Sequence, residues 1–204
     1  MMQNDWAYLE KYALENQKLL KQLNDGNRIV FIGDSITEFW KQKDSIFFNQ
    51  NNYINRGISS QTSVHVLERF DNDVISLKPK SVIILVGIND IAENFGPISL
   101  EEIMVNITLM VEKSLKNNIE VLLCSILPAN SFYWNPKIQP IEKIIQLNQM
   151  IEAYCILKQL DFVDYYTEMV DENLSLDKKY TDDGVHPNLE GYLKMKAILE
   201  THIK

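Results

Sequence analysis

The chain has 204 residues, of which 46% are hydrophobic and 24% charged, so it is long enough for one domain with a substantial core. Its net charge of −8 argues against nucleic acid or an anionic membrane as the main partner, because both call for a basic surface. Cys124 and Cys155 lie in apolar or helical patterns without a CxxC motif, which predicts buried thiols rather than a disulfide framework.

The first residues, MMQNDWAYLEKY, lack the basic and apolar regions of a signal peptide, and no apolar run has the length of a membrane span. These features fit a cytoplasmic protein. They fit equally well a mature exported protein whose leader has been removed, so the compartment stays open.

Five segments have the apolar, β-branched composition of buried strands. In chain order they are 28–33 (RIVFIG), a weaker 52–55 (NYIN), 81–87 (SVIILVG), 120–127 (EVLLCSIL) and 160–165 (LDFVDY). Near-continuous apolarity is typical of strands that are covered on both faces, as in a parallel sheet.

Helical patterns alternate with these strands. Ser99 and Glu102 predict a capping box before one helix, and Pro140 can open the next. The apolar stripes expected to face the core are Trp6, Leu9, Ala13 and Leu20 within residues 1–27; Val64, Leu67, Phe70, Val74 and Leu77; Leu100, Ile103, Met104, Ile107, Met110, Val111 and Leu115; Ile141, Ile144, Ile145, Met150, Ile151 and Tyr154; and Leu189, Leu193 and Leu199. The alternation predicts a single domain over residues 1–204, a three-layer α/β/α sandwich on a flavodoxin-like, five-stranded parallel sheet.

Small and polar residues follow the predicted strands and fill the last loop. They are GDS at 33–35, NRG at 55–57, GIND at 87–90 and DDGVHP at 182–187. Because the carboxyl ends of parallel strands meet at one edge of a sheet, we expect these segments to converge. A serine, a glycine, an asparagine, an aspartate and a histidine could then supply the groups needed for acyl transfer.

Each of these residues also has a purely structural interpretation. Ser35 could cap a helix, Gly57 could form a turn, Asn89 could form an Asx-turn, and His186 could lie on the surface. Their shared position at strand ends or in the last loop favours the catalytic interpretation.

The ordered blocks GDSI, NRG, GIND and DGVH resemble the four signature blocks of the SGNH (GDSL) hydrolases, over about residues 28–200. The segments NRGISSQTSVHVLERF and KPKSVIILVGIND most resemble the catalytic subunits of platelet-activating-factor acetylhydrolase and similar bacterial acylesterases. Ile36 stands where the family name has leucine, which is a volume-conserving change. The resemblance implies a serine ester hydrolase without cofactor or metal, and the dimeric relatives leave a homodimer open.

The resemblance implies a role for each matching residue. Ser35 would be the nucleophile, His186 the base and Asp183 the partner of that base. The oxyanion would be bound by the backbone N–H groups of Ser35 and Gly57 and by the Asn89 amide. Serine needs a neighbouring imidazole to accept its proton, and neutral N–H donors favour the oxyanion over the carbonyl, so the residue chemistry agrees.

Several acidic and histidine residues are alternatives to this set. Asp182 is the rival of Asp183, although D-x-x-H spacing favours Asp183. Asp34 could organise the turn, tune the electrostatics or contact substrate. We expect His65 and His202 to be structural or solvated, and no histidine pair has metal-ligand spacing.

The loop at 129–140 carries Phe132, Tyr133 and Trp134, which could shape substrate choice or cover the core. We therefore expect an acylesterase acting through an acyl-enzyme on small esters, with short acyl groups on a sugar or lipid alcohol. The alternatives are a lysophospholipase or thioesterase for longer chains and a non-catalytic, flavodoxin-like binding domain.

Overall fold

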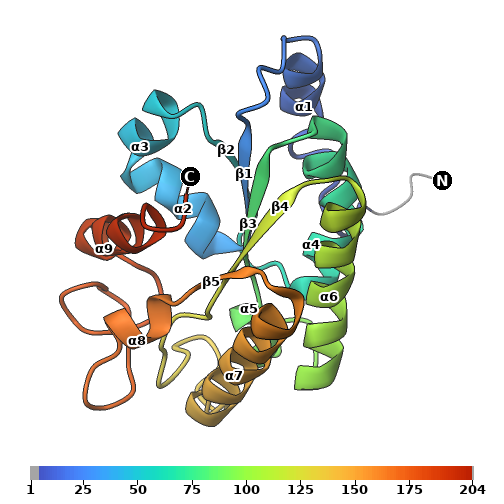
Figure 1. The fold of residues 1–204 in the computed structure, drawn as a ribbon. Coiled ribbons are helices and arrows are strands. Elements are labelled where there is room, and N and C mark those ends of the chain that lie inside the picture. The colour runs from blue at the N-terminus through green and yellow to red at the C-terminus, as the bar shows by residue number, and fades with distance from the viewer. Residues whose placement is uncertain (1–4, 204) are drawn as a thin grey trace.

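The computed structural model describes residues 5–203, which form a parallel sheet of five strands in the order β2-β1-β3-β4-β5 (Figure 1). The strands are β1 (Ile29–Gly33), β2 (Ile54–Gly57), β3 (Ser81–Leu85), β4 (Glu120–Cys124) and β5 (Asp161–Val163). The α-helices are α1 (Ala13–Leu20), α2 (Ser35–Lys43), α3 (Ser45–Gln50), α4 (Ser63–Asp73), α5 (Ile88–Ile91), α6 (Leu100–Lys116), α7 (Ile141–Lys158), α8 (Tyr165–Met169) and α9 (Leu189–Leu199). The predicted α/β fold with five parallel strands is confirmed.

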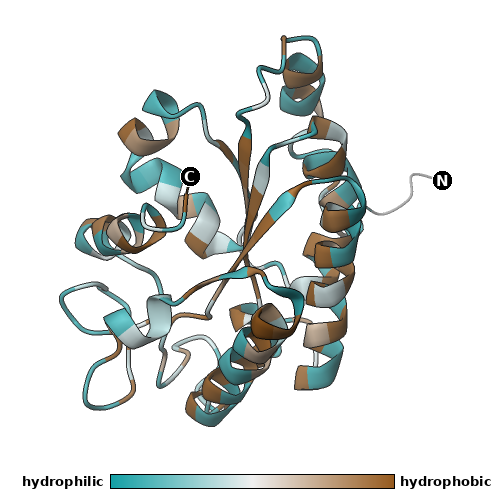
Figure 2. Ribbon diagram, in the orientation of Figure 1, coloured by the Kyte–Doolittle hydropathy of each residue, from teal (hydrophilic) through white to brown (hydrophobic). Residues whose placement is uncertain are grey.

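Helices cover both faces of the sheet, as right-handed crossovers require. Helices α4, α6 and α7 lie on one face, with α1 against α4, whereas α2, α3 and α9 lie on the other (Figure 1). Hydrophobic residues run along the strands and along the inward side of most helices (Figure 2). The resulting core leaves the carboxyl edge of the sheet for polar side chains.

All five strands differ from their predicted bounds, and the differences at β2 and β4 have a clear local cause. β2 begins at Ile54 rather than at residue 52, because Asn52 adopts a left-handed turn with φ 55° before the pairing with β1 starts. β4 ends at Cys124 although the apolar run continues to 127. The Asn148 side chain accepts from the Ile126 N–H at 2.7 Å and donates to its carbonyl at 2.9 Å, in place of a neighbouring strand.

The buried faces of three helices differ from the predicted apolar stripes. The predicted helix at 64–77 divides into α4 and a single 3₁₀ turn at Ile75–Leu77. Val64 on α4 is 41% exposed, while buried polar side chains on the inner face hydrogen-bond with one another. In α9, Leu189 and Leu193 are exposed and Tyr192 is buried instead. Leu115, at the end of α6, is also exposed.

The N-terminal helix is shorter than predicted. α1 begins at Ala13, and Trp6 and Leu20 are exposed, so the expected stripe is wrong at both ends. The part of this prediction at residues 1–4 lies outside the described residues. The capping box of Ser99 and Glu102 is confirmed at the start of α6. Within residues 5–203, no helix is long and apolar enough to cross a membrane.

Candidate active site

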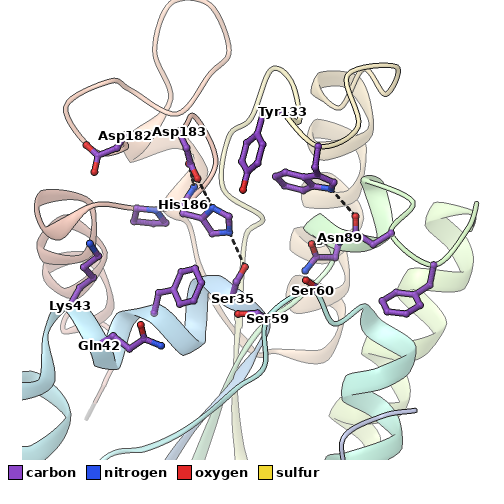
Figure 3. Close-up of a pocket in the computed structure, with 15 residues that line it drawn as sticks. Ser35, Gln42, Lys43, Ser59, Ser60, Asn89, Tyr133, Asp182, Asp183 and His186 are labelled. Atoms are coloured by element: carbon purple, nitrogen blue, oxygen red, sulfur yellow. Dashed lines mark hydrogen bonds and ion pairs between the residues drawn. The ribbon is translucent and has the colours of Figure 1, made fainter. Parts of the chain in front are cut away.

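Three side chains from two distant segments form a hydrogen-bonded chain at the carboxyl edge of the sheet (Figure 3). Ser35 is the first residue of α2, directly after β1, and its Oγ lies 2.9 Å from His186 Nε2. On the other side of the imidazole, Nδ1 lies 2.7 Å from Asp183 Oδ2. With Nδ1 protonated and donating to this carboxylate, Nε2 is free to accept the serine proton.

The loop before α9 fixes the orientation of Asp183 relative to His186. Asp183 Oδ1 accepts from the backbone N–H of Val185 at 2.9 Å and of His186 at 2.7 Å, while Oδ2 faces the imidazole. Partial burial works against ionisation, but the hydrogen bonds from His186 and Val185 outweigh it and hold the pKa of Asp183 below its usual value. Asp182 is exposed at the rim, so Asp183 is the carboxylate that contacts the ring (Figure 3).

The other two histidines lie apart from Ser35. His65 Nδ1 lies 2.7 Å from Thr62 Oγ1 on α4, and His202 pairs with Asp161 at 3.7 Å. In the part of the chain from 5 to 203, no group of three His, Cys, Asp or Glu side chains is arranged to hold a metal ion. Cys124 and Cys155 are buried and unpaired, as the sequence predicted.

Asn89 presents an amide beside Ser35 (Figure 3). It lies on α5, just after β3, and its Nδ2 donates to the Gln61 carbonyl at 3.0 Å. Its Oδ1 accepts from Asn94 Nδ2 at 2.8 Å, which fixes the orientation of the amide. Because an amide nitrogen carries two protons, one N–H remains for a ligand in the cavity.

Gly57 does not have the predicted placement. Its N–H donates to Asn55 Oδ1 at 2.9 Å, so this donor is already used inside the protein. A Cβ at this position would overlap the backbone of Glu38, so the glycine allows β2 and α2 to pack closely rather than allowing a substrate to approach. The prediction that Gly57 faces the substrate is therefore wrong.

Ser60 lies where Gly57 was expected. It lines the cavity below Asn89 and adopts φ 66°, a left-handed conformation that is uncommon for a residue with a side chain (Figure 3). No acceptor within residues 5–203 takes its backbone N–H. Sequence reasoning missed this residue, because a serine in a loop gives no sign of its backbone angle. An outlier of this kind at a cavity is typical of functional loops.

A buried polar network lies beneath these loops and joins them. The Arg69 guanidinium donates to the Gly33 carbonyl at 2.9 Å, to Gln61 Oε1 at 2.6 Å and to Asp73 Oδ2 at 2.8 Å. Gln61 Nε2 in turn donates to the Ala7 carbonyl at 2.8 Å. Arg69 thus connects the strand before the nucleophile to the loop that positions Asn89.

Replacing Arg69 with methionine should destabilise the fold by about 3–5 kcal/mol, because it leaves the buried Asp73 carboxylate without its partner. The matched control is Lys113→Met, which breaks the exposed ion pair with Asp71 and should cost about 0–1 kcal/mol. Urea unfolding monitored by circular dichroism measures both. Equal losses for the two variants would contradict the role assigned to the network.

Asp34 is buried beneath the site and does not line the cavity. It is 1% exposed, it caps α2 by accepting from the Ile36 N–H at 3.0 Å, and it is absent from the cavity lining. The prediction of substrate contact by Asp34 is therefore wrong, and its predicted role in organising the turn is correct. Burial raises its pKa to about 7, with the nearby Asp90 carboxylate adding to the effect.

This raised pKa predicts a pH-dependent stability difference. The folded-state pKa of about 7 exceeds the unfolded value of 3.8, so Asp34 increasingly opposes folding as pH rises between these values. The free energy of unfolding of Asp34→Asn, compared with that of wild type, should therefore increase as the pH rises from 4 to 8. The increase should be at most about 4 kcal/mol. Urea unfolding at both pH values tests this, with exposed Asp182→Asn as the control. A difference that does not change with pH would refute the prediction.

The aromatic side chains of the loop at 129–140 are divided between the core and the cavity. Phe132 is fully buried and packs under Trp134, with ring centroids 5.0 Å apart, so its predicted substrate contact is wrong. Tyr133 and Trp134 line the cavity, and Trp134 Nε1 donates to Asn94 Oδ1 at 2.8 Å. Trp134 therefore also braces the asparagine that orients Asn89.

The cavity above Ser35 has a volume of about 820 Å³ and a polar and aromatic wall. Among residues 5–203, none of its lining side chains is leucine, isoleucine, valine or methionine. The residues that line it are Ser35, Phe39, Gln42, Lys43, Ser59, Ser60, Asn89, Asn94, Phe95, Tyr133, Trp134, Asp182, Asp183, His186 and Pro187. Amides, hydroxyls and flat rings suit a hydroxyl-rich ligand better than an alkyl chain.

Residues 31–194 match the GDSL-like lipase/acylhydrolase family, and the chain belongs to this family. A candidate acylhydrolase from Bacteroides fragilis NCTC 9343 is 44% identical, with 98% of each chain covered and a TM-score of 0.95. A candidate platelet activating factor protein from Streptococcus pneumonia is 26% identical, with 96% of this chain and 92% of that chain covered and a TM-score of 0.81.

Two further relatives are more distant. The acetyl xylan esterase AlAXEase shares the fold at 20% identity, with 87% of this chain and all 100% of that chain covered and a TM-score of 0.71. The uncharacterized lipoprotein YqeF of Bacillus subtilis (strain 168) is 33% identical over 78 residues, which make up 37% of this chain and 32% of that protein. This match therefore spans about a third of the lipoprotein.

Proposed function

We propose that the protein is a serine carboxylester hydrolase that works through an acyl-enzyme. The observation that carries this proposal is the continuous contact from Ser35 Oγ to His186 Nε2 at 2.9 Å and from His186 Nδ1 to Asp183 Oδ2 at 2.7 Å. A serine activated by an imidazole, with a carboxylate fixing the tautomer, is the arrangement used for acyl transfer on several unrelated folds.

In the proposed reaction, Ser35 Oγ attacks the ester carbonyl carbon and His186 Nε2 takes the serine proton. The tetrahedral oxyanion receives hydrogen bonds from the backbone N–H groups of Ser35 and Ser60 and from Asn89 Nδ2. The intermediate collapses, the C–O bond to the alcohol breaks, and His186 returns the proton to the departing alcohol. Water then attacks the acyl-enzyme by the same steps and releases the carboxylic acid.

The proposed oxyanion donors give a direct test. Asn89→Ala should lower kcat about 10²- to 10³-fold with little change in KM, because the donor acts mainly on the charge that develops in the transition state. Ser60→Gly keeps the backbone N–H and relieves the left-handed strain, so it serves as the matched control and should retain activity. Steady-state kinetics with p-nitrophenyl acetate measure both. Full activity in Asn89→Ala would remove Asn89 from the proposed mechanism.

We propose short acyl groups on a hydroxyl-rich alcohol as the substrate class, because no leucine, isoleucine, valine or methionine of the described residues lines the cavity. A series of p-nitrophenyl esters from acetate to palmitate tests this choice and should show highest kcat/KM with acetate. An optimum at long chains would favour the lysophospholipase or thioesterase alternative. Absence of turnover and of fluorophosphonate labelling would favour the non-catalytic binding domain.

A further inference from the structure

A second cavity adjoins the proposed active site. It has a volume of about 630 Å³ and shares Phe95 with the cavity above Ser35. Phe95 is 65% exposed, so its ring lies accessible at the boundary between the two spaces. The residues that line the second cavity are Asp5, Trp6, Tyr8, Thr62, Val64, His65, Asp90, Phe95, Gly96, Pro97, Ile98 and Glu102.

The exposed aromatic side chains of the described residues are confined to these two cavities. Trp6, Tyr8, Phe95, Tyr133 and Trp134 are between 37% and 68% exposed, and each lines one cavity or both. Exposed aliphatic side chains, by contrast, are spread over α1, α3, α4, α6, α7, α9 and loops, and among the described ones Val64 alone lines the second cavity. If these were ordinary apolar residues of a protein surface, aromatic and aliphatic side chains would be scattered alike. The gathering of the exposed aromatic side chains at the two cavities instead points to a ligand that is recognised by flat rings.

The rings form a path that leads away from the catalytic histidine. The Trp134 ring lies 6.4 Å from the His186 ring and is hydrogen-bonded to Asn94, the neighbour of Phe95. The Phe95 ring centroid lies 4.2 Å from that of His65, and His65 lies 5.0 Å from Trp6. An extended ligand that starts at Ser35 would therefore meet a ring surface along this path.

The charges in the second cavity limit what it can hold. Asp5, Asp90 and Glu102 line it, and in the described chain no lysine or arginine does so. An anionic phosphate group would be repelled by these carboxylates. Neutral hydroxyl groups can instead donate to carboxylate oxygens, while the apolar face of a sugar ring stacks on an indole or a phenyl ring.

We propose that the second cavity is a subsite for a neighbouring sugar ring of an esterified oligosaccharide whose esterified ring occupies the cavity above Ser35. This inference rests on the proposed ester hydrolase function and specifies its substrate as longer than one sugar unit. Trp6 and Phe95 provide the stacking surfaces, and Asp5, Thr62 and Glu102 provide acceptors for hydroxyl groups.

The test compares kcat/KM for acetylated xylotetraose and acetylated xylose. Wild type should prefer the tetrasaccharide about tenfold, and Trp6→Ala should reduce this ratio toward one by raising KM for the longer substrate. Turnover of p-nitrophenyl acetate needs only the cavity above Ser35. It therefore measures the amount of functional enzyme in each preparation, and the kcat/KM values are divided by it. Ile156→Ala is the control, because Ile156 is 73% exposed on α7 outside both cavities, and it should leave the ratio at the wild-type value.

Phe95→Ala is a second variant, on a different segment from Trp6, in case the first fails to fold. Xylotetraose binding to the Ser35→Ala protein, measured by calorimetry, gives a readout without turnover and should weaken at least fivefold when Trp6→Ala is added. Equal kcat/KM for both sugars, or a ratio that neither variant changes, would overturn the subsite while leaving the hydrolase proposal in place. No turnover of p-nitrophenyl acetate by wild type would instead overturn the hydrolase proposal itself.

Discussion

Ser35→Ala should lower kcat for p-nitrophenyl acetate by roughly 10⁶-fold, because it removes the hydroxyl that we propose as the nucleophile while His186 stays in position. The residual rate would come from binding and oxyanion stabilisation alone. Ser35 is 6% exposed and starts α2 without capping it, so the alanine should cost little stability. Circular dichroism and the thermal midpoint verify that the variant is folded.

A fluorophosphonate probe provides a second measure of the same change. Wild type should be labelled covalently at Ser35, which intact-protein and peptide mass spectrometry can locate. Ser60→Ala is the matched control, since this serine lines the same cavity and the substitution keeps its backbone N–H. Labelling that persists in Ser35→Ala, or that disappears in Ser60→Ala alone, would show that another hydroxyl is the nucleophile.

Asp183→Asn should lower kcat about 10⁴-fold, the second-largest effect expected for a single substitution. The amide can donate to Nδ1 and so favours the tautomer whose Nε2 carries the proton, which leaves His186 unable to accept from Ser35. It also removes the negative charge that stabilises the imidazolium. Steady-state kinetics with p-nitrophenyl acetate measure the loss.

Asp182→Asn is the control for this experiment because Asp182 is adjacent in sequence and exposed at the cavity rim. It should stay within about threefold of wild type. A loss of similar size in both variants would mean that the substitution disturbs the loop at 181–187 as a whole. A loss in Asp182→Asn alone would identify that residue as the partner of the base.

The strand pattern was sufficient to predict the sheet, because five apolar runs that alternate with helical segments can be covered on both faces in few ways. The same topology brings Ser35, Asn89 and His186 to one edge, as their positions at strand ends had suggested. The spacing of Asp183 and His186 was informative because a single short loop holds both.

Other features of the fold and the site depend on contacts between distant residues, which the pattern of apolar residues in the sequence does not reveal. The inner face of α4 uses Arg69 and Asp73, whose burial depends on their ion pair and on hydrogen bonds to other segments. The donor role expected of Gly57 is excluded by the Asn55 side chain, and the cavity position at Ser60 depends on a backbone angle. Trp6 reaches His65 because the N-terminal segment folds back across α4, a contact between residues far apart in sequence.

The proposed nucleophile Ser35 and the proposed base His186 lie 151 positions apart, with four of the five strands of the sheet between them. During synthesis, all five strands leave the ribosome before the imidazole does. Ser35 can then be in place and still have no acceptor for its proton. Under the proposed mechanism, a nascent or truncated polypeptide that ends before position 186 should therefore be inert toward esters.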